Sequence, residues 1–163
     1  MIPVIKFKKI HPNFCLPKRE SIFAAGFDLR YMPDGVIVVE DCDNERDSED
    51  GALLIKPLER KLLPLGFQIE IPPGYEMQLR PRSGLAKKVG LTILNSPGTI
   101  DSDYRGPVGA ILINLGSEDA FIYPGMRICQ GVIASVPAFN VEMTTELSDT
   151  ERGSGGFGST GQR

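Results

Sequence analysis

The sequence has little of what disulfide frameworks and zinc sites are made from. Its 163 residues include only three cysteines, Cys15, Cys42 and Cys129, and one histidine, His11. The cysteines are odd in number, lie far apart and show no Cys-x-x-Cys spacing, whereas zinc sites use clustered thiolates and imidazoles. We therefore expect neither a disulfide framework nor a zinc site.

Long hydrophobic runs are missing as well. The first ten residues carry three lysines between short apolar runs, and no stretch approaches the roughly 20 apolar residues of a membrane-spanning helix. The net charge is −3, with 24% charged and 41% hydrophobic residues, which does not indicate a polyelectrolyte partner. These properties predict a globular cytoplasmic protein with no membrane and no stable nucleic-acid partner.

Clear helical periodicity is almost absent, whereas glycine and proline are plentiful. The 18 glycines and 13 prolines divide the chain into short apolar runs, which predicts an all-β domain of the sandwich, jelly-roll or related barrel class. One short helix is expected over 85–89, with Ser83 as its cap and Gly90 at its end. The expected strands cover residues 3–7, 26–31, 36–39, 53–56, 65–71, 75–80, 91–94, 108–115, 120–123 and 127–136.

Two segments depart from this pattern. Residues 41–50 hold six carboxylates against Arg46; an EF-hand loop would need glycine where Arg46 stands, so we expect a solvated loop. Residues 152–163 place five glycines around Phe157. Their spacing resembles a Walker A loop, but Ser159 replaces the lysine and neither a strand nor a helix flanks the segment, which excludes a P-loop. The tail is either disordered or a mobile segment that binds phosphate and stacks Phe157 on a base.

Four further segments carry polar groups of chemical interest. The loop from Gly98 to Gly106 contains Asp101, Asp103 and Tyr104, which fits a site but also fits a structural hairpin. The segment 80–86 joins two arginines to Ser83 at a helix start, which favours an anion over an ordinary cap. Weaker signals are Asp28 in an apolar strand and, in another strand, Arg127 with Gln130.

These five segments, in this order and spacing, resemble the five motifs of the trimeric dUTPase family. The resemblance spans nearly the whole chain, from Ala25 to Gly161. It implies a β-clip or distorted jelly-roll subunit that assembles as a homotrimer with an exchanged C-terminal arm. On this interpretation residues 1–147 form one domain, 41–50 form its acidic surface loop, and 148–163 form a flexible arm that closes over the active site.

The resemblance also assigns roles to residues that contact the nucleoside. Tyr104 packs against the deoxyribose, where a 2′-hydroxyl would not fit. Asp101 orients and deprotonates the attacking water. Uracil is read by the hairpin backbone at Asn95, Gly98 and Ile100.

The remaining roles concern the triphosphate and its metal ion. Asp28 contacts Mg²⁺ through water and not directly, and it is counted with Asp101 and Gln130 as catalytic. The triphosphate is held by Arg82, Ser83, Gly84 and Gln130, while the fifth motif closes the site with Arg152, Phe157, Gly158, Ser159 and Thr160. The implied reaction is in-line attack of water on the α-phosphate of dUTP, giving dUMP and pyrophosphate, which limits uracil in DNA and supplies dUMP for dTMP synthesis.

Two alternatives and three departures accompany the resemblance. A dCTP deaminase would need a general acid/base carboxylate beyond the hairpin, and residues 106–117 contain none. A nonenzymatic dUTP-binding regulatory module stays open. The acidic stretch 41–50 looks like an insertion, Pro107 stands where many members have glutamate, and Cys129 where many have alanine.

Overall fold

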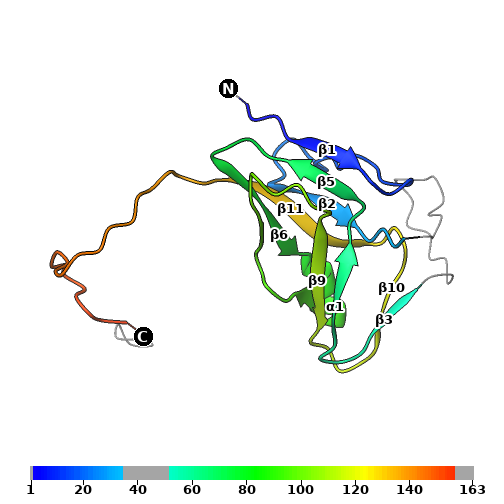
Figure 1. Ribbon diagram of the computed structural model, residues 1–163. Helices are drawn as coiled ribbons and strands as arrows, with labels where there is room; N and C mark the ends of the chain where they lie inside the picture. Colours follow the sequence, from blue (N-terminus) through cyan, green and yellow to red (C-terminus); the bar gives the residue numbers. More distant parts are fainter. Residues whose placement is uncertain (1, 35–51, 157–163) are drawn as a thin grey trace.

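The computed structural model describes residues 2–34 and 52–156. Over these residues the chain forms short strands and one helix, α1 (Ser83–Val89) (Figure 1). Within the described residues, no helix is long and apolar enough to cross a membrane. The strands are β1 (Lys6–Lys9), β2 (Gly26–Arg30), β3 (Leu53–Ile55), β4 (Arg60–Pro64), β5 (Phe67–Glu70), β6 (Tyr75–Pro81), β7 (Leu91–Ile93), β8 (Gly98–Ile100), β9 (Gly109–Asn114), β10 (Ala120–Ile122) and β11 (Arg127–Ser135).

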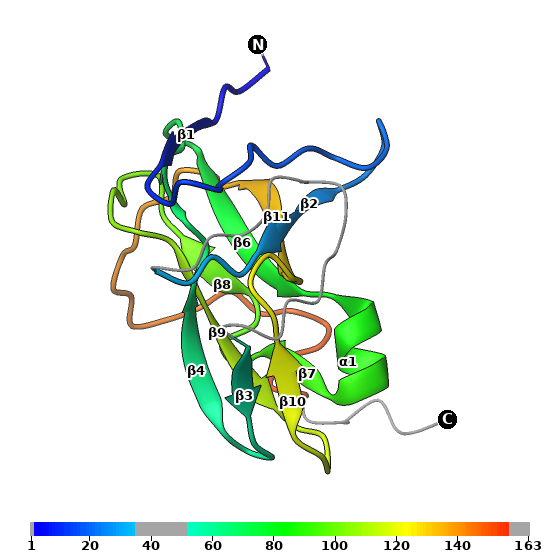
Figure 2. The ribbon, with the colours of Figure 1, turned by 90° about the vertical axis from the view of Figure 1, so that its right-hand side faces the viewer.

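A four-stranded sheet in the order β2-β11-β6-β8 forms the centre of the fold. A three-stranded sheet, β4-β9-β7, and two strand pairs, β1-β5 and β3-β10, surround it, and all these pairings are antiparallel. The helix α1 follows β6 directly and lies beside β7 (Figure 2). The sheet therefore sets the ends of β2, β6 and β11 side by side.

Alternation of apolar and polar side chains explains which strand faces are buried. In β9 the side chains of Ala110 and Leu112 enter the core, whereas Ile111 and Ile113 are only partly covered. Burying a side chain such as Leu112 contributes roughly 1.5–3 kcal/mol relative to leaving it exposed. The core is continuous across the sheets.

Aromatic packing fixes β2 against β1 and β5. The ring of Phe7 lies 5.0 Å from that of Phe67 and 6.0 Å from that of Phe27, measured between centroids. Such edge and tilted contacts add about 0.5–1.5 kcal/mol each beyond burial. Because Phe27 is the neighbour of Asp28, this cluster holds the strand that carries the carboxylate.

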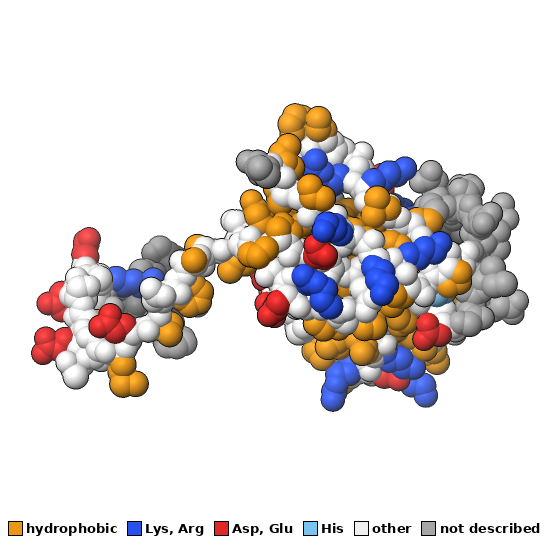
Figure 3. Space-filling view, turned by 45° about the horizontal axis from the view of Figure 1, so that its top comes forward, with side chains coloured by type: hydrophobic (Ala, Val, Ile, Leu, Met, Phe, Trp, Pro, Cys, Tyr) orange, Lys and Arg blue, Asp and Glu red, His pale blue; other side chains and the backbone are white. Residues whose placement is uncertain are grey.

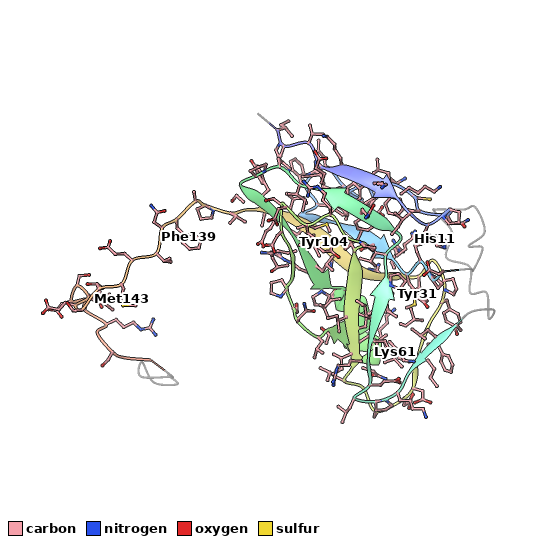
Figure 4. All side chains as sticks on the ribbon, viewed as in Figure 1. His11, Tyr31, Lys61, Tyr104, Phe139 and Met143 are labelled. Atoms are coloured by element: carbon pink, nitrogen blue, oxygen red, sulfur yellow. The ribbon has the colours of Figure 1, made fainter. Side chains whose placement is uncertain are left out.

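The chain beyond β11 leaves the body of the protein as an extended arm (Figure 1). Residues 136–156 form neither strand nor helix and are mostly exposed. Phe139 and Met143 are 77% and 98% exposed, and both lie away from the body (Figure 4). Apolar and acidic side chains stand together on this arm (Figure 3).

The all-β class with one short helix is confirmed, with several local corrections. The helix ends at Gly90 as expected, in the left-handed conformation with φ 76°, but its N-cap is Arg82 and no side chain bonds the cap position. Ser83 is already inside the helix, so its predicted capping role is wrong. The strands β4 and β8 were not predicted, because their sequences lack strict alternation, and the expected strand 36–39 lies outside the described residues.

Two of the cysteines differ in their bonding. The sequence predicted no disulfide framework, and it gave no sign that Cys15 is disulfide-bonded, whereas Cys129 is free and buried. Pairing requires the two α-carbons to lie about 5.5 Å apart in space. Spacing along the chain does not reveal that distance.

Candidate active site

Three of the five motif segments meet where β11 lies between β2 and β6. Gln130 on β11 pairs across the sheet with Asp28 on β2 and with Arg80 on β6. The side-chain amide of Gln130 donates a hydrogen bond to the Pro81 carbonyl at 3.2 Å. The sheet register thus brings the segments that carry Asp28, Arg82 and Gln130 together at one end of these strands, which is called the sheet edge below.

Asp28 is held between two arginines at this edge. Its Oδ1 lies 3.1 Å from Nε of Arg82, and its Oδ2 lies 3.4 Å from Nη1 of Arg127. Arg82 also donates from Nη1 to the Arg127 carbonyl at 3.1 Å. All three side chains are more than two-thirds covered, so these ion pairs are less screened than surface pairs. The Asp28 carboxylate therefore fixes the direction of the Arg82 guanidinium.

The start of α1 adds backbone donors next to Arg82. The first helical hydrogen bond runs from the Ala86 amide to the Arg82 carbonyl at 3.0 Å, so the amides of Ser83 and Gly84 have no partner within the helix. Both residues are exposed. One guanidinium, one hydroxyl and free amides at a single point form an arrangement that can bind phosphate oxygens.

The hairpin that contains Asn95 and β8 begins close to Arg80 and Gln130, and its later residues lie farther from them. A recess of about 480 Å³ lies between Arg80 and Gln130 on the sheet and the Ser96-Pro97 dipeptide of the hairpin. The amide of Asn95 lies beside Gly98, within 3.4 Å of the position a β-carbon would take there. The predicted uracil-contacting residues Asn95, Gly98 and Ile100 thus lie in one hairpin, with Gly98 and Ile100 on β8.

Asp101 and Tyr104 are joined by one tight turn after β8. The Tyr104 amide donates to the Asp101 carbonyl at 3.2 Å, and both side chains are exposed. Arg105 closes the turn by donating from Nη1 to the carbonyls of Ser102 and Tyr104 at 2.7 and 2.8 Å. Gln68 of β5 donates to the Arg105 carbonyl at 2.7 Å. These bracing roles of Arg105 and Gln68 were missed, since nothing in the sequence marks them as partners.

A single chain does not bring all predicted groups together. Ile100 pairs with Met77, so Asp101 follows at the level of Glu76, whereas Arg82 lies beyond the opposite end of β6. Six residues of strand separate these levels, about 20 Å at roughly 3.3 Å per residue. Arg152 lies on the arm, where its Nε donates to the Gly155 carbonyl at 2.8 Å. Phe157, Gly158, Ser159 and Thr160 lie outside the described residues.

The arrangement at Asp28 does not favour direct metal ligation. Over residues 2–34 and 52–156, His, Cys, Asp and Glu side chains form no group of three or more that could hold a metal ion. Both Asp28 oxygens already face guanidinium groups, but each retains a lone pair that can accept a hydrogen bond from a water molecule. The contact of Asp28 with magnesium through water stays a prediction.

Cys129 lies beneath the same edge and is chemically inert. Burial, followed by the nearby Asp28 charge, raises the pKa of its thiol to about 12. The reactive species of cysteine is the thiolate. Cys129 therefore stays protonated and does not act as a nucleophile near neutral pH.

Sequence comparisons place the chain among enzymes of one kind. A family model described as dUTPase matches residues 50–161. The deoxyuridine 5′-triphosphate nucleotidohydrolase of Caulobacter vibrioides is 49% identical over 160 residues, covering 96% of this chain and 94% of its own. That of Rhizobium etli is 53% identical over 146 residues, covering 90% and 85%.

Structural comparisons agree. A Staphylococcus bacteriophage 80alpha dUTPase mutant with dUpNHpp has a TM-score of 0.79 at 23% identity, covering 97% of this chain and 98% of its own. A mutant dUTPase from phage phi11 of S. aureus, described with a structural Mg(II) ion, has a TM-score of 0.71 at 19% identity, covering 90% and 99%. At these identities the likeness concerns the fold. With the family model over more than half of the sequence and relatives near 50% identity over almost all of it, the chain belongs to the dUTPase family.

Proposed function

We propose that this protein hydrolyses dUTP to dUMP and pyrophosphate by attack of water on the α-phosphate. The observation that carries the proposal is the single turn that joins an exposed carboxylate, Asp101, to an exposed ring, Tyr104, directly after the hairpin strand β8. A carboxylate beside a sugar-sized wall can activate water at the first phosphate of a bound nucleotide. The reaction removes dUTP from the precursors of DNA and supplies dUMP for dTMP synthesis.

Substrate selection rests on the hairpin. The backbone around Asn95, Gly98 and Ile100 reads uracil, and a thymine methyl group would collide with it. The Tyr104 ring packs on the deoxyribose, so that a 2′-hydroxyl is excluded sterically. Asp101 then accepts a proton from the water that attacks in line with the departing pyrophosphate.

The triphosphate is bound by groups on the sheet edge and by the arm. Arg82 is held by Asp28 at 3.1 Å, which directs the rest of its guanidinium fork outward. Gln130 and the amides of Ser83 and Gly84 complete this side of the site. Closure by the arm brings the proposed fifth-motif groups, Arg152, Phe157, Gly158, Ser159 and Thr160.

Magnesium accompanies the nucleotide. Asp28 faces it through water, since both carboxylate oxygens are engaged by arginines and magnesium retains several of its waters. When bound, the ion supplies neutralisation of charge on the phosphate oxygens. Asp28 itself keeps Arg82 oriented and accepts hydrogen bonds from the hydration shell.

A homotrimer with shared sites accounts for the separation of Asp101 from Arg82 along β6. The outward face of β4 and β9 supports this assembly. Leu62 on β4 is 70% exposed and pairs with Ile111 on β9. The amide of Leu94, which follows β7, donates a hydrogen bond to the Ile111 carbonyl. Such an apolar face is typical of an interface between subunits. The extended arm is the second support, since it reaches away from its own body (Figure 3). We place this assembly in the cytoplasm.

Product analysis tests the proposed reaction. The protein is incubated with dUTP, dCTP or UTP in the presence of magnesium, and nucleotides, pyrophosphate and ammonia are measured. Formation of dUMP and pyrophosphate from dUTP alone is expected. Ammonia from dCTP would indicate a deaminase, and binding of dUTP without turnover would indicate a regulatory module; either result would contradict the proposal.

A further inference from the structure

We infer that Gly106 is a specificity-determining residue, because the absence of a side chain there sets the position of the Tyr104 ring. A β-carbon built on Gly106 would lie 2.4 Å from the Tyr104 hydroxyl oxygen, 2.7 Å from Cζ and 3.0 Å from Cε2. Distances below 3.0 Å are not tolerated between such atoms, so the ring occupies the space that any other residue at position 106 would fill. The inference rests on the proposed function, in which this ring is the wall beside the sugar.

A hydrogen bond also holds the tip of the Tyr104 ring in this place. The Tyr104 hydroxyl donates to the Pro107 carbonyl at 2.8 Å. The proline ring fixes φ at position 107, and therefore limits where the Pro107 carbonyl carbon can lie relative to Gly106. The loop therefore binds the tip of Tyr104 to the backbone that immediately follows Gly106.

The cheapest response to a side chain at position 106 is movement of Tyr104. The three closest atoms to the added β-carbon all belong to Tyr104, so the Tyr104 ring is the first group that the new side chain would meet. Tyr104 is 42% exposed, so its ring can move toward solvent. Displacement breaks its bond to Pro107, which is an exposed bond worth about 1 kcal/mol. The fold should thus tolerate alanine at 106, while the ring leaves its place.

Movement of the ring by about 1 Å is enough to alter catalytic selection, because positioning errors of that size change rates by up to about 100-fold. A wall displaced from the sugar leaves room for a 2′-hydroxyl and packs less well on deoxyribose. Gly106→Ala should therefore lower kcat/KM for dUTP and raise the relative use of UTP. We expect the ratio of kcat/KM for dUTP to that for UTP to fall roughly tenfold or more.

A double-mutant cycle separates this role from a merely structural one. The ratio of kcat/KM for dUTP and UTP is measured for wild type, Gly106→Ala, Tyr104→Ala and the double variant, with melting temperatures for each. Gly106→Ala should relax the ratio in the wild-type background and have no further effect once Tyr104 is alanine. Tyr104→Phe, which keeps the ring and loses the bond to Pro107, should fall between wild type and Gly106→Ala.

The outcomes distinguish the inference from the proposed function. If the wild type does not hydrolyse dUTP in preference to UTP, the proposed function fails. The role assigned to Gly106 is wrong if the wild type discriminates but Gly106→Ala lowers kcat/KM equally for dUTP and UTP. It is also wrong if Gly106→Ala changes the ratio of the two values by the same factor in the Tyr104→Ala background.

Discussion

At the scale of single residues, the charged groups of this protein are positioned mainly by one another. Asp28 on β2, Arg127 on β11 and Arg82 at the start of α1 form one connected set. The sequence predicted Asp28 and Arg82 as site residues, each for its own chemistry. Their mutual contact could not be predicted, because it depends on the sheet register that places β11 between β2 and β6.

Asp101→Asn should abolish most turnover while retaining substrate binding. An amide keeps the size of the side chain but cannot accept the proton of the attacking water, and removal of a general base costs roughly 100-fold or more. The measurements are kcat for dUTP and the dissociation constant of a nonhydrolysable analogue. Near-normal kcat would contradict the proposed role of Asp101.

Arg82→Lys should lower kcat/KM for dUTP at least tenfold. A single ammonium group cannot bond Asp28 and a phosphate oxygen together as a planar guanidinium fork can. Steady-state kinetics on Arg82→Lys are compared with those on Arg80→Lys, whose guanidinium bonds the Gln78 side chain at 2.6 Å. An equal or larger loss in Arg80→Lys would argue against the specific geometry at Arg82.

At the scale of elements, patterning predicted where chain segments extend but not how they pair. The alternation of β6 and the glycine after α1 identified these elements correctly. The three-residue strand β8 was missed because its definition comes from pairing with β6. That pairing also positions the hairpin and Asp101. The strand that the sequence did not predict is thus the one that positions the proposed general base.

Gly90→Ala should destabilise the protein more than Gly74→Ala. Both glycines have positive φ, 76° and 86°, which costs about 1–2 kcal/mol for other residues. At Gly90 a β-carbon would additionally lie 2.4 Å from the Gly116 amide nitrogen, whereas nothing lies within 4 Å at Gly74. Denaturant unfolding of both variants measures the difference, and equal losses would show that the loop at Gly116 yields freely.

At the scale of the whole molecule, the family resemblance predicted an assembly that one chain cannot display. Composition and patterning do not indicate trimers, because a subunit interface is built from the same apolar residues as a core. What the fold adds is an outward apolar face and a division of the predicted groups between the two ends of β6.

Mixing two inactive variants tests this division. Asp101→Asn and Arg82→Ala chains, co-refolded in equal amounts, should regain activity when Asp101 of one subunit serves Arg82 of another. Random assembly would restore about a quarter of such sites. No recovery, with mixed oligomers demonstrated by differently tagged chains, would mean that each chain completes its own site.

Deletion of residues after Glu151 should reduce kcat/KM for dUTP roughly 100-fold or more and leave the oligomer intact. The removed segment carries all proposed closing groups, whereas the body and the first part of the arm stay in place. Light scattering reports the assembly and steady-state kinetics report the loss. A fully active truncated protein would refute the role of the arm as a lid.

The composition of the extended arm has a practical consequence for protease digestion. Between Val136 and Thr150 the arm contains no lysine or arginine, and Arg152 is the first tryptic position along it. Arg152 is exposed and lies in a turn, where backbone is readily cut. Brief trypsin treatment of the native protein should therefore detach residues 153–163 as one peptide, and bound nucleotide should slow its release.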